Sequence, residues 1–173
     1  MHSRWRTLVL SGIIIATTTA KLGATIAANG RENNSKNACV ESDCPRQVFS
    51  LNRNWKQYTT LDPPSISSNG CEFSETQECR FEYEDTHWNT VSIPHDFVVE
   101  GTFDETTNDK DHGYLPLGYS WYRKRFNKPS VHNKTWRLEF EGCMWRCHVY
   151  LNHKYLGNST SGYLPFWFDA ILE

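Results

Sequence analysis

Two neighbouring side chains in the middle of the chain could do chemistry: the imidazole of His95 and the carboxylate of Asp96. They follow Ile93-Pro94, and a proline ends a strand and forces an extended residue before it, so we expect both on a loop. A carboxylate there can accept two or more strong hydrogen bonds from the hydroxyl groups of a ligand. The alternative is that Asp96 caps its own loop by bonding nearby backbone N–H groups. We favour a structural role for His95 and keep it as a candidate substrate-binding residue.

A second group of candidates lies on segment 118–126, Gly-Tyr-Ser-Trp-Tyr-Arg-Lys-Arg-Phe. Trp121 could form a stacking platform for a substrate, and Arg123 with Arg125 could line a basic cleft. Arginine more often lies on an aromatic face or forms a salt bridge, here to one of the glutamates of segment 139–141. We favour that structural interpretation and keep Trp121 as a candidate substrate-binding residue.

Three other clusters lack the features that their chemistry requires. Glu139 and Glu141 lie on one face of a predicted strand, about 7 Å apart, but no substrate cleft is evident around them. Segment 143–148 holds two cysteines and a histidine, which in a secreted chain favour a disulfide over a metal. Segment 109–113 is acidic but lacks the distant glutamate of a calcium loop. We therefore expect no catalytic pair, metal or cofactor, and the formal net charge of −2 gives no reason to expect a nucleic acid partner.

The N-terminus has the features of a signal peptide, which we place at residues 1–20. Two arginines precede an apolar run, Leu8 to Ala20, that falls short of the about 20 apolar residues a membrane span requires. Residues 21–45 are small and polar without apolar periodicity, which predicts a linker or a disordered segment. The predicted domain follows at residues 46–173.

Glycosylation and cysteine patterns agree with a secretory route. Three N-glycosylation sequons begin at Asn33, Asn133 and Asn158. An even number of cysteines, six, fits an oxidising compartment, and we expect an extracellular, lysosomal or vacuolar protein without a membrane span after signal cleavage.

The sequence leaves the pairing of the cysteines open. Our working prediction is pairing of nearest neighbours: Cys39–Cys44, Cys71–Cys79 and Cys143–Cys147. The last pair requires a turn between its two residues, because on a continuous strand they would lie about 13 Å apart.

The segments that must position these residues alternate apolar and polar side chains with a period of two. Trp136, Leu138 and Phe140 share one face of a predicted strand, and segments 121–126 and 147–151 alternate in the same way. Half-buried strands show this pattern, because successive side chains leave opposite faces. The strands are short and separated by Gly, Pro and Asn turns. The sequence therefore predicts an all-β fold, an antiparallel sandwich or barrel.

Several blocks occur in an order and spacing that resemble a known family. They are Val-Ser-Ile-Pro-His-Asp-Phe at 91–97, Gly-Tyr-Ser-Trp-Tyr-Arg-Lys-Arg-Phe at 118–126, Trp-Arg-Leu-Glu-Phe-Glu-Gly at 136–142, Val-Tyr-Leu-Asn-His-Lys-Tyr-Leu-Gly at 149–157 and Ser-Gly-Tyr-Leu-Pro-Phe at 161–166. Over about residues 48–173 the chain resembles the N-terminal sugar-binding domain of family 2 glycoside hydrolases, the β-galactosidase, β-glucuronidase and β-mannosidase group. Segment 49–56 resembles the family's opening strand, and we expect its Trp55 to fill the core.

The resemblance implies a jelly-roll β-sandwich, of the galactose-binding-domain type, that precedes an immunoglobulin-like domain and a (β/α)₈ barrel. Asp96 matches the acidic or amide residue of the family's Pro-x-Asp/Asn-Trp segment, which can reach the sugar held by the catalytic domain; Phe97 replaces the usual tryptophan. The family's hairpin carries Asn-Gly where this chain has Asn152-His153, a change that should weaken or lengthen the turn. The barrel supplies both catalytic glutamates, and a chain of 173 residues has no room for a barrel of about 250.

The resemblance therefore implies the carbohydrate-binding domain of a secreted, β-galactosidase-like glycoside hydrolase, C-terminally incomplete at Glu173. We expect the chain alone to be inactive and its partners to be a β-galactoside-like carbohydrate and a catalytic domain. One alternative is a free-standing, lectin-like secreted module that binds sugar without a partner. Another is a disulfide-stapled interaction protein whose open sheet edge pairs with a second chain.

Overall fold

Short antiparallel strands are the main regular elements of the part of the chain that the structure describes. The computed structural model describes residues 7–14, 23–29, 46–61, 65–66, 68–69, 78, 83–108, 110–127, 136–144 and 146–170. Its elements are β1 (Thr7–Ile14), β2 (Gly23–Asn29), β3 (Arg46–Ser50), β4 (Trp55–Thr60), β5 (Asn89–Val91), the short 3₁₀ helix η2 (Lys110–His112), β6 (Tyr119–Asn127), β7 (Trp136–Gly142), β8 (Cys147–Leu151), β9 (Lys154–Ser159) and β10 (Phe166–Ala170). Within the described residues, no helix is long and apolar enough to cross a membrane.

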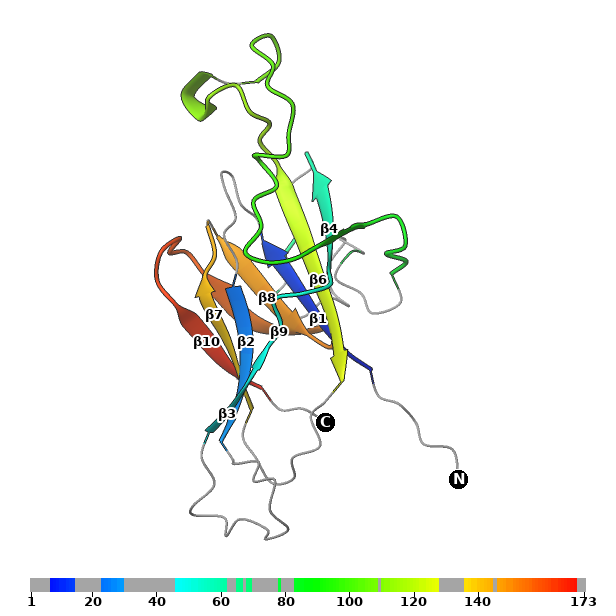
Figure 1. The fold of residues 1–173 in the computed structure, drawn as a ribbon, viewed down its shortest axis with the longest axis vertical. Helices are drawn as coiled ribbons and strands as arrows, with labels where there is room; N and C mark the ends of the chain where they lie inside the picture. The colour runs from blue at the N-terminus through cyan, green and yellow to red at the C-terminus, as the bar shows by residue number, and fades with distance from the viewer. Residues whose placement is uncertain are drawn as a thin grey trace, which may run out of the picture.

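The strands form two sheets (Figure 1). One sheet has six strands in the order β5-β4-β6-β1-β8-β9, and the other has four in the order β10-β7-β2-β3. Every strand pair is antiparallel. The later part of the segment between β5 and β6, which includes η2, projects from one end of the two sheets (Figure 1). The all-β, antiparallel prediction is confirmed.

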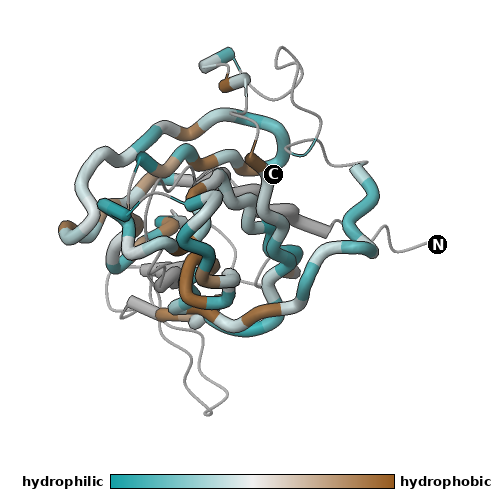
Figure 2. Tube along the Cα trace, turned by 90° about the horizontal axis from the view of Figure 1, so that it is seen from above, coloured by the Kyte–Doolittle hydropathy of each residue, from teal (hydrophilic) through white to brown (hydrophobic). Residues whose placement is uncertain are grey.

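The main core lies between the sheets and follows the period-two pattern of the sequence. In β7 the side chains of Trp136, Leu138 and Phe140 are buried, and they pack in one cluster with residues of β8 such as Val149. Trp55 is fully buried in the same cluster and donates its indole N–H to the carbonyl oxygen of Leu51, as expected of a core tryptophan. Figure 2 shows hydrophobic and hydrophilic residues alternating along stretches of the chain.

A second, smaller cluster covers the opposite face of the six-stranded sheet. It consists of Trp88, Trp121 and Tyr150, with partly buried aromatic neighbours that include Tyr58 and Tyr83. Neighbouring residues of a strand point to opposite faces, so Tyr122 belongs to the main core while Trp121 belongs to this cluster. Both faces of the six-stranded sheet are therefore covered at β6.

Two strands lie within the residues that are predicted to form a signal peptide and a linker. Thr7–Ile14 forms β1, which pairs with β6 along its whole length and with β8 from Leu10 to Ile14. Gly23–Asn29 forms β2, which lies between β7 and β3. The sequence pattern did not predict either strand. β1 pairs with β6 and β8, and β2 pairs with β7, all more than 100 residues away, and the pairing is made through the backbone. Signal cleavage itself stays a prediction.

The hairpin between β8 and β9 keeps a two-residue turn. Leu151 pairs with Lys154, and the two residues between them, Asn152 and His153, have φ angles of 48° and 69°. Positive φ at both central positions is the geometry of a type I′ turn. The turn is therefore not lengthened, and His153 adopts a conformation that glycine would adopt more easily.

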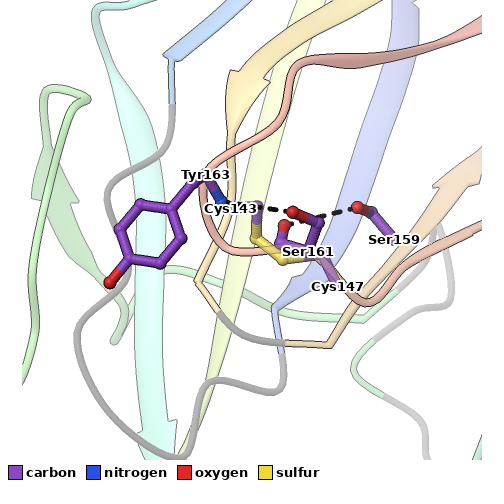
Figure 3. Close-up of a disulfide and its surroundings, with 5 residues drawn as sticks. All are labelled: Cys143, Cys147, Ser159, Ser161 and Tyr163. Carbon is purple, nitrogen blue, oxygen red and sulfur yellow. Dashed lines mark hydrogen bonds between the residues drawn. A yellow bond between two sulfur atoms is a disulfide. The ribbon is translucent and has the colours of Figure 1, made fainter.

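A disulfide joins Cys143 to Cys147 across the turn between β7 and β8, which confirms that predicted pair (Figure 3). The two Cα atoms are 6.2 Å apart, and the positive φ of Arg146, 59°, helps to reverse the chain between them. Both cysteines are buried in the main core. The side chain of Tyr163 points away from the disulfide in Figure 3. The other four predicted disulfide cysteines, Cys39, Cys44, Cys71 and Cys79, lie outside the described residues.

Candidate functional site

The loop at residues 93–101 is the candidate site, and buried apolar side chains hold it in place. Ile93, Phe97 and Val98 are all buried in the main core. The backbone N–H of Ile93 donates to the carbonyl oxygen of Asn52 at 2.8 Å, and the Ile93–Pro94 peptide bond is cis. His95 and Asp96 lie between these buried residues, which fix the backbone of the loop.

His95 is bonded through both ring nitrogens. Its Nδ1 lies 2.6 Å from the hydroxyl oxygen of Tyr122, and its Nε2 lies 3.0 Å from Oε1 of Glu100. Burial raises the pKa of Tyr122, so the phenol keeps its proton and can donate to Nδ1 while Nε2–H donates to the carboxylate of Glu100. The side chain of His95 is only 8% exposed. This arrangement favours the structural interpretation of His95.

Asp96 caps its own loop, which is one of the two roles predicted for it. Its Oδ1 accepts a hydrogen bond from the backbone N–H of Val98 at 3.0 Å, a typical turn contact of aspartate. The carboxylate is half-buried, and no hydrogen bond to Oδ2 occurs among the described residues. A carboxylate has lone pairs on both oxygens, so this cap and a hydrogen bond to a ligand hydroxyl are compatible.

The segment that follows packs tightly against this loop. The backbone N–H of Gly101 donates to the carbonyl oxygen of Val98 at 3.0 Å. A Cβ atom at position 101 would lie 2.1 Å from Cγ of Pro116, so only glycine allows this approach. The loop at 93–101 and the segment that contains Pro116 therefore lie in close contact at Gly101.

Asp104 organises the next turn. Its carboxylate accepts hydrogen bonds from the hydroxyl and the backbone N–H of Thr106, at 2.6 and 2.8 Å, and from the hydroxyl of Thr107 at 2.8 Å. These bonds, the Thr106 hydroxyl first, lower the pKa of Asp104 to about 2. Residues 104–107 of the acidic segment thus form a turn with its own hydrogen bonds.

Trp121 lies apart from His95 and Asp96. It is 1% exposed and packs with Trp88 and Tyr150 in the smaller cluster. Its neighbour Tyr122 contacts His95 from the other face of β6, so the structure does not bring Trp121 to the loop at 93–101. This burial favours the structural interpretation of Trp121. The parts of Trp121, His95 and Asp96 in substrate binding stay predictions.

The buried arginine of β6 pairs with a different acid from the one expected. Nη1 of Arg123 lies 3.1 Å from Oδ2 of Asp85, and Nη1 of Arg125 lies 2.9 Å from its Oδ1. The Arg123 guanidinium also lies over the ring of Trp88, with Cζ 4.9 Å from the centroid, and over that of Tyr83. Of the two structural alternatives for this arginine, the contact with an aromatic face is confirmed. The glutamates of β7 belong to the other sheet, and the smaller cluster brings Asp85 to β6 instead.

Asn158 is the one predicted glycosylation site within the described residues. It is exposed on β9, and its Nδ2 donates to the hydroxyl of Tyr155 at 3.0 Å. β9 ends the six-stranded sheet, so a glycan at Asn158 would lie at the margin of that sheet. Asn33 and Asn133 lie outside the described residues. Glycosylation stays a prediction at all three positions.

Sequence reasoning missed three residues that shape these contacts. The signal for Tyr122 was present, because the alternation of segment 121–126 places it toward the core. No local signal marks Glu100 or Asp85, because each is recognised only by what it contacts in the fold. Among the described residues, no group of three or more potential ligands could hold a metal ion.

Known proteins with similar sequences are glycosidases. Beta-galactosidase BoGH2A from Bacteroides ovatus is 35% identical over 89 residues, which cover 50% of this chain and 10% of that protein. A beta-glucuronidase from Formosa agariphila is 32% identical over 133 residues, covering 75% of this chain and 12% of that protein. A beta-galactosidase from Thermoanaerobacter pseudethanolicus is 30% identical over 92 residues, covering 52% and 11%.

These relatives are much longer than the chain, which spans about a tenth of their length. No family model and no solved structure matches the chain. Over a short region, the chain is homologous to glycoside hydrolases of the β-galactosidase and β-glucuronidase type.

Proposed function

We propose that this chain is the N-terminal carbohydrate-binding domain of a larger, secreted glycoside hydrolase of family 2, with a jelly-roll fold. The observation that carries the proposal is the alignment of 75% of the chain with 12% of a beta-glucuronidase, a proportion typical of one domain in a multidomain enzyme. The antiparallel two-sheet fold supports it, because β-sandwiches commonly present binding loops at their ends.

In this proposal the loop at 93–101 borders a sugar site that is completed by a catalytic domain. Asp96 would use Oδ1 to hold its own loop through Val98 and Oδ2 to accept a hydrogen bond from a sugar hydroxyl. His95 would position the loop through Tyr122 without touching the sugar. The domain itself supplies no catalytic glutamate, so hydrolysis would depend on residues of the catalytic barrel.

The first test is the size of the native product. An antibody raised against residues 91–173 should detect a secreted band several-fold larger than the 20.1 kDa of this chain, and the transcript should continue into a barrel domain. The native protein should hydrolyse a nitrophenyl β-galactoside or β-glucuronide. A secreted band near 20 kDa with a stop codon after Glu173 would overturn the proposal and leave a non-catalytic module.

The second test separates the two uses of Asp96 in the native-length enzyme. Asp96→Asn keeps an oxygen that can accept the Val98 N–H but removes the charge, whereas Asp96→Ala removes both. If Asp96 contacts the sugar, Asp96→Asn should keep the melting temperature and lower kcat/KM by roughly tenfold or more, the loss of one hydrogen bond to a charged group. Full activity in Asp96→Asn, with a loss in Asp96→Ala that follows its melting temperature, would restrict Asp96 to its capping role.

A further inference from the structure

The outer face of β7 and β10 carries an exposed tryptophan that the proposed sugar loop does not use. Trp167 is 55% exposed, whereas the other tryptophans among the described residues, Trp55, Trp88, Trp121 and Trp136, are at most 3% exposed. A large aromatic side chain gains most from burial, so its exposure on a sheet face indicates a surface that contacts something else.

Strand alternation and register place three polar side chains around this ring. Phe166 and Phe168 of β10 pack against the main core, so Trp167 and Asp169 leave the opposite face. Trp167 pairs directly with Glu139 of β7, and Asp169 pairs with Arg137. Neighbouring strands lie about 5 Å apart, and alternate residues along a strand lie about 7 Å apart. The four residues thus form a block about the size of a single pyranose ring, which we call the Trp167 block.

The arginine of the Trp167 block is held by two of its neighbours. Nε of Arg137 donates to Oδ1 of Asp169 at 3.1 Å, and Cζ of Arg137 lies 5.3 Å from the centroid of the Trp167 ring. Arg137 and Asp169 are 43% and 69% exposed in their side chains. An exposed ion pair of this kind adds little to stability. The pair holds the N–H donors of Arg137 and the oxygen acceptors of Asp169 in place beside the exposed ring of Trp167.

The charges of the Trp167 block restrict its ligand. One arginine and two carboxylates give it a formal charge of −1. An anionic ligand such as a nucleic acid would be disfavoured. A neutral sugar fits, because the apolar C–H face of a pyranose can lie on an indole ring while its hydroxyl groups hydrogen-bond to guanidinium and carboxylate groups.

We propose that the Trp167 block is a second carbohydrate-binding site, which takes a neutral pyranose unit of a polysaccharide. Trp167 is the stacking platform, and Arg137 and Asp169 bind the hydroxyl groups. The block lies on the outer face of the four-stranded sheet, whereas the loop at 93–101 contacts Tyr122 of the six-stranded sheet from the core side. The inference shares with the proposed function only the class of ligand.

The test is affinity electrophoresis of the full chain in gels that contain soluble β-galactan, β-glucan or mannan. At least one of these neutral polysaccharides should retard the wild type. The retardation should persist in about 0.5 M sodium chloride, because salt at this concentration screens charge-driven binding. Trp167→Ala should weaken binding at least tenfold, and Trp167→Phe, which keeps a stacking ring, should retain most of it. Asp169→Asn should weaken binding severalfold.

A matched variant controls for the loss of an exposed aromatic ring. Tyr163→Ala removes a ring that is 84% exposed outside the block, and this variant should be retarded like the wild type. Melting temperatures of Trp167→Ala and the wild type should agree. The proposal is overturned if none of the three polysaccharides retards the wild type, or if Trp167→Ala binds as the wild type does. It is also overturned if the variant changes only the oligomeric state, which would indicate a protein-docking face.

Activity distinguishes this proposal from the proposed function. In the native-length protein, Trp167→Ala should leave hydrolysis of a small nitrophenyl glycoside unchanged while it removes retention on the polysaccharide. A protein that proves to have no glycosidase activity but is retarded through Trp167 would overturn the proposed function and support the Trp167 block.

Discussion

The hydroxyl oxygen of Tyr122 lies 2.6 Å from Nδ1 of His95, and this contact joins the core of the six-stranded sheet to the candidate sugar loop. Tyr122 is fully buried, so loss of its hydroxyl leaves a buried ring nitrogen without its partner. We expect Tyr122→Phe to lower the free energy of unfolding by about 1–3 kcal/mol, measured by urea denaturation. Tyr119→Phe on the same strand should change it by less than about 0.5 kcal/mol. Equal effects of the two substitutions would contradict a specific role for the His95 contact.

The ion pair between Arg123 and Asp85 should be sensitive to removal of the acid. Both side chains are almost completely buried, so Asp85→Asn removes a buried negative charge that lies next to the Arg123 guanidinium. We expect a loss of about 3 kcal/mol in the free energy of unfolding. Arg125→Gln removes the exposed partner of the same carboxylate and should cost less than about 1 kcal/mol. A larger loss in Arg125→Gln than in Asp85→Asn would show that the buried pair is not the stabilising one.

The hairpin turn between β8 and β9 offers a stabilising substitution. His153 has a φ of 69°, a conformation that costs a non-glycine residue roughly 1 kcal/mol. His153→Gly should therefore raise the free energy of unfolding by roughly 0.5–1 kcal/mol, read as a higher melting temperature. His153→Ala keeps the unfavourable conformation and serves as the control without a gain. A melting temperature that falls in His153→Gly would mean that the imidazole makes contacts worth more than the strain.

The turn around Asp104 should weaken only in strong acid. The pKa of Asp104 is lowered to about 2 from a usual value of 3.8, chiefly by the Thr106 hydroxyl. Because the folded state holds the carboxylate ionised, its contribution is fully present above about pH 4 and is lost as the pH falls through 2. NMR titration of the Asp104 carboxyl should give a midpoint near 2, and the Thr106 amide signal should shift with it. A midpoint near 4 would indicate that the three hydrogen bonds are absent in solution.

Strand β1 occupies an internal position, so its removal should open the six-stranded sheet. A chain of residues 21–173 lacks β1 and leaves β6 and β8 without their partner strand, with unpaired backbone groups in the middle of the sheet. We expect this shorter chain to form concentration-dependent oligomers in size-exclusion chromatography with light scattering. At the same concentration, the full chain should contain a smaller fraction of oligomers. A monomer of 21–173 that melts cooperatively at the same temperature as the full chain would contradict the internal position of β1.

The sequence by itself determined the strands β6, β7 and β8 and the position of the candidate loop. Period-two alternation in β7 and β8 assigns each side chain to a face, because adjacent residues of a strand must point in opposite directions. Pro94 and the polar residues after it identify the loop for a similarly local reason, since proline restricts its own backbone and that of the preceding residue. The sequence left the pairing of Cys143 with Cys147 open, and the turn with a positive φ at Arg146 brings the two residues together.

Only the tertiary structure decided which strands are neighbours and which distant groups meet. Asp85 reaches Arg123 across 38 residues, and β1 lies between β6 and β8, although local pattern marks neither contact. Alternation tells which face a side chain occupies, but it does not tell what covers that face. Trp121 and Trp167 therefore look alike in the sequence, yet one is enclosed by the smaller aromatic cluster and the other stays exposed on the outer face of β10.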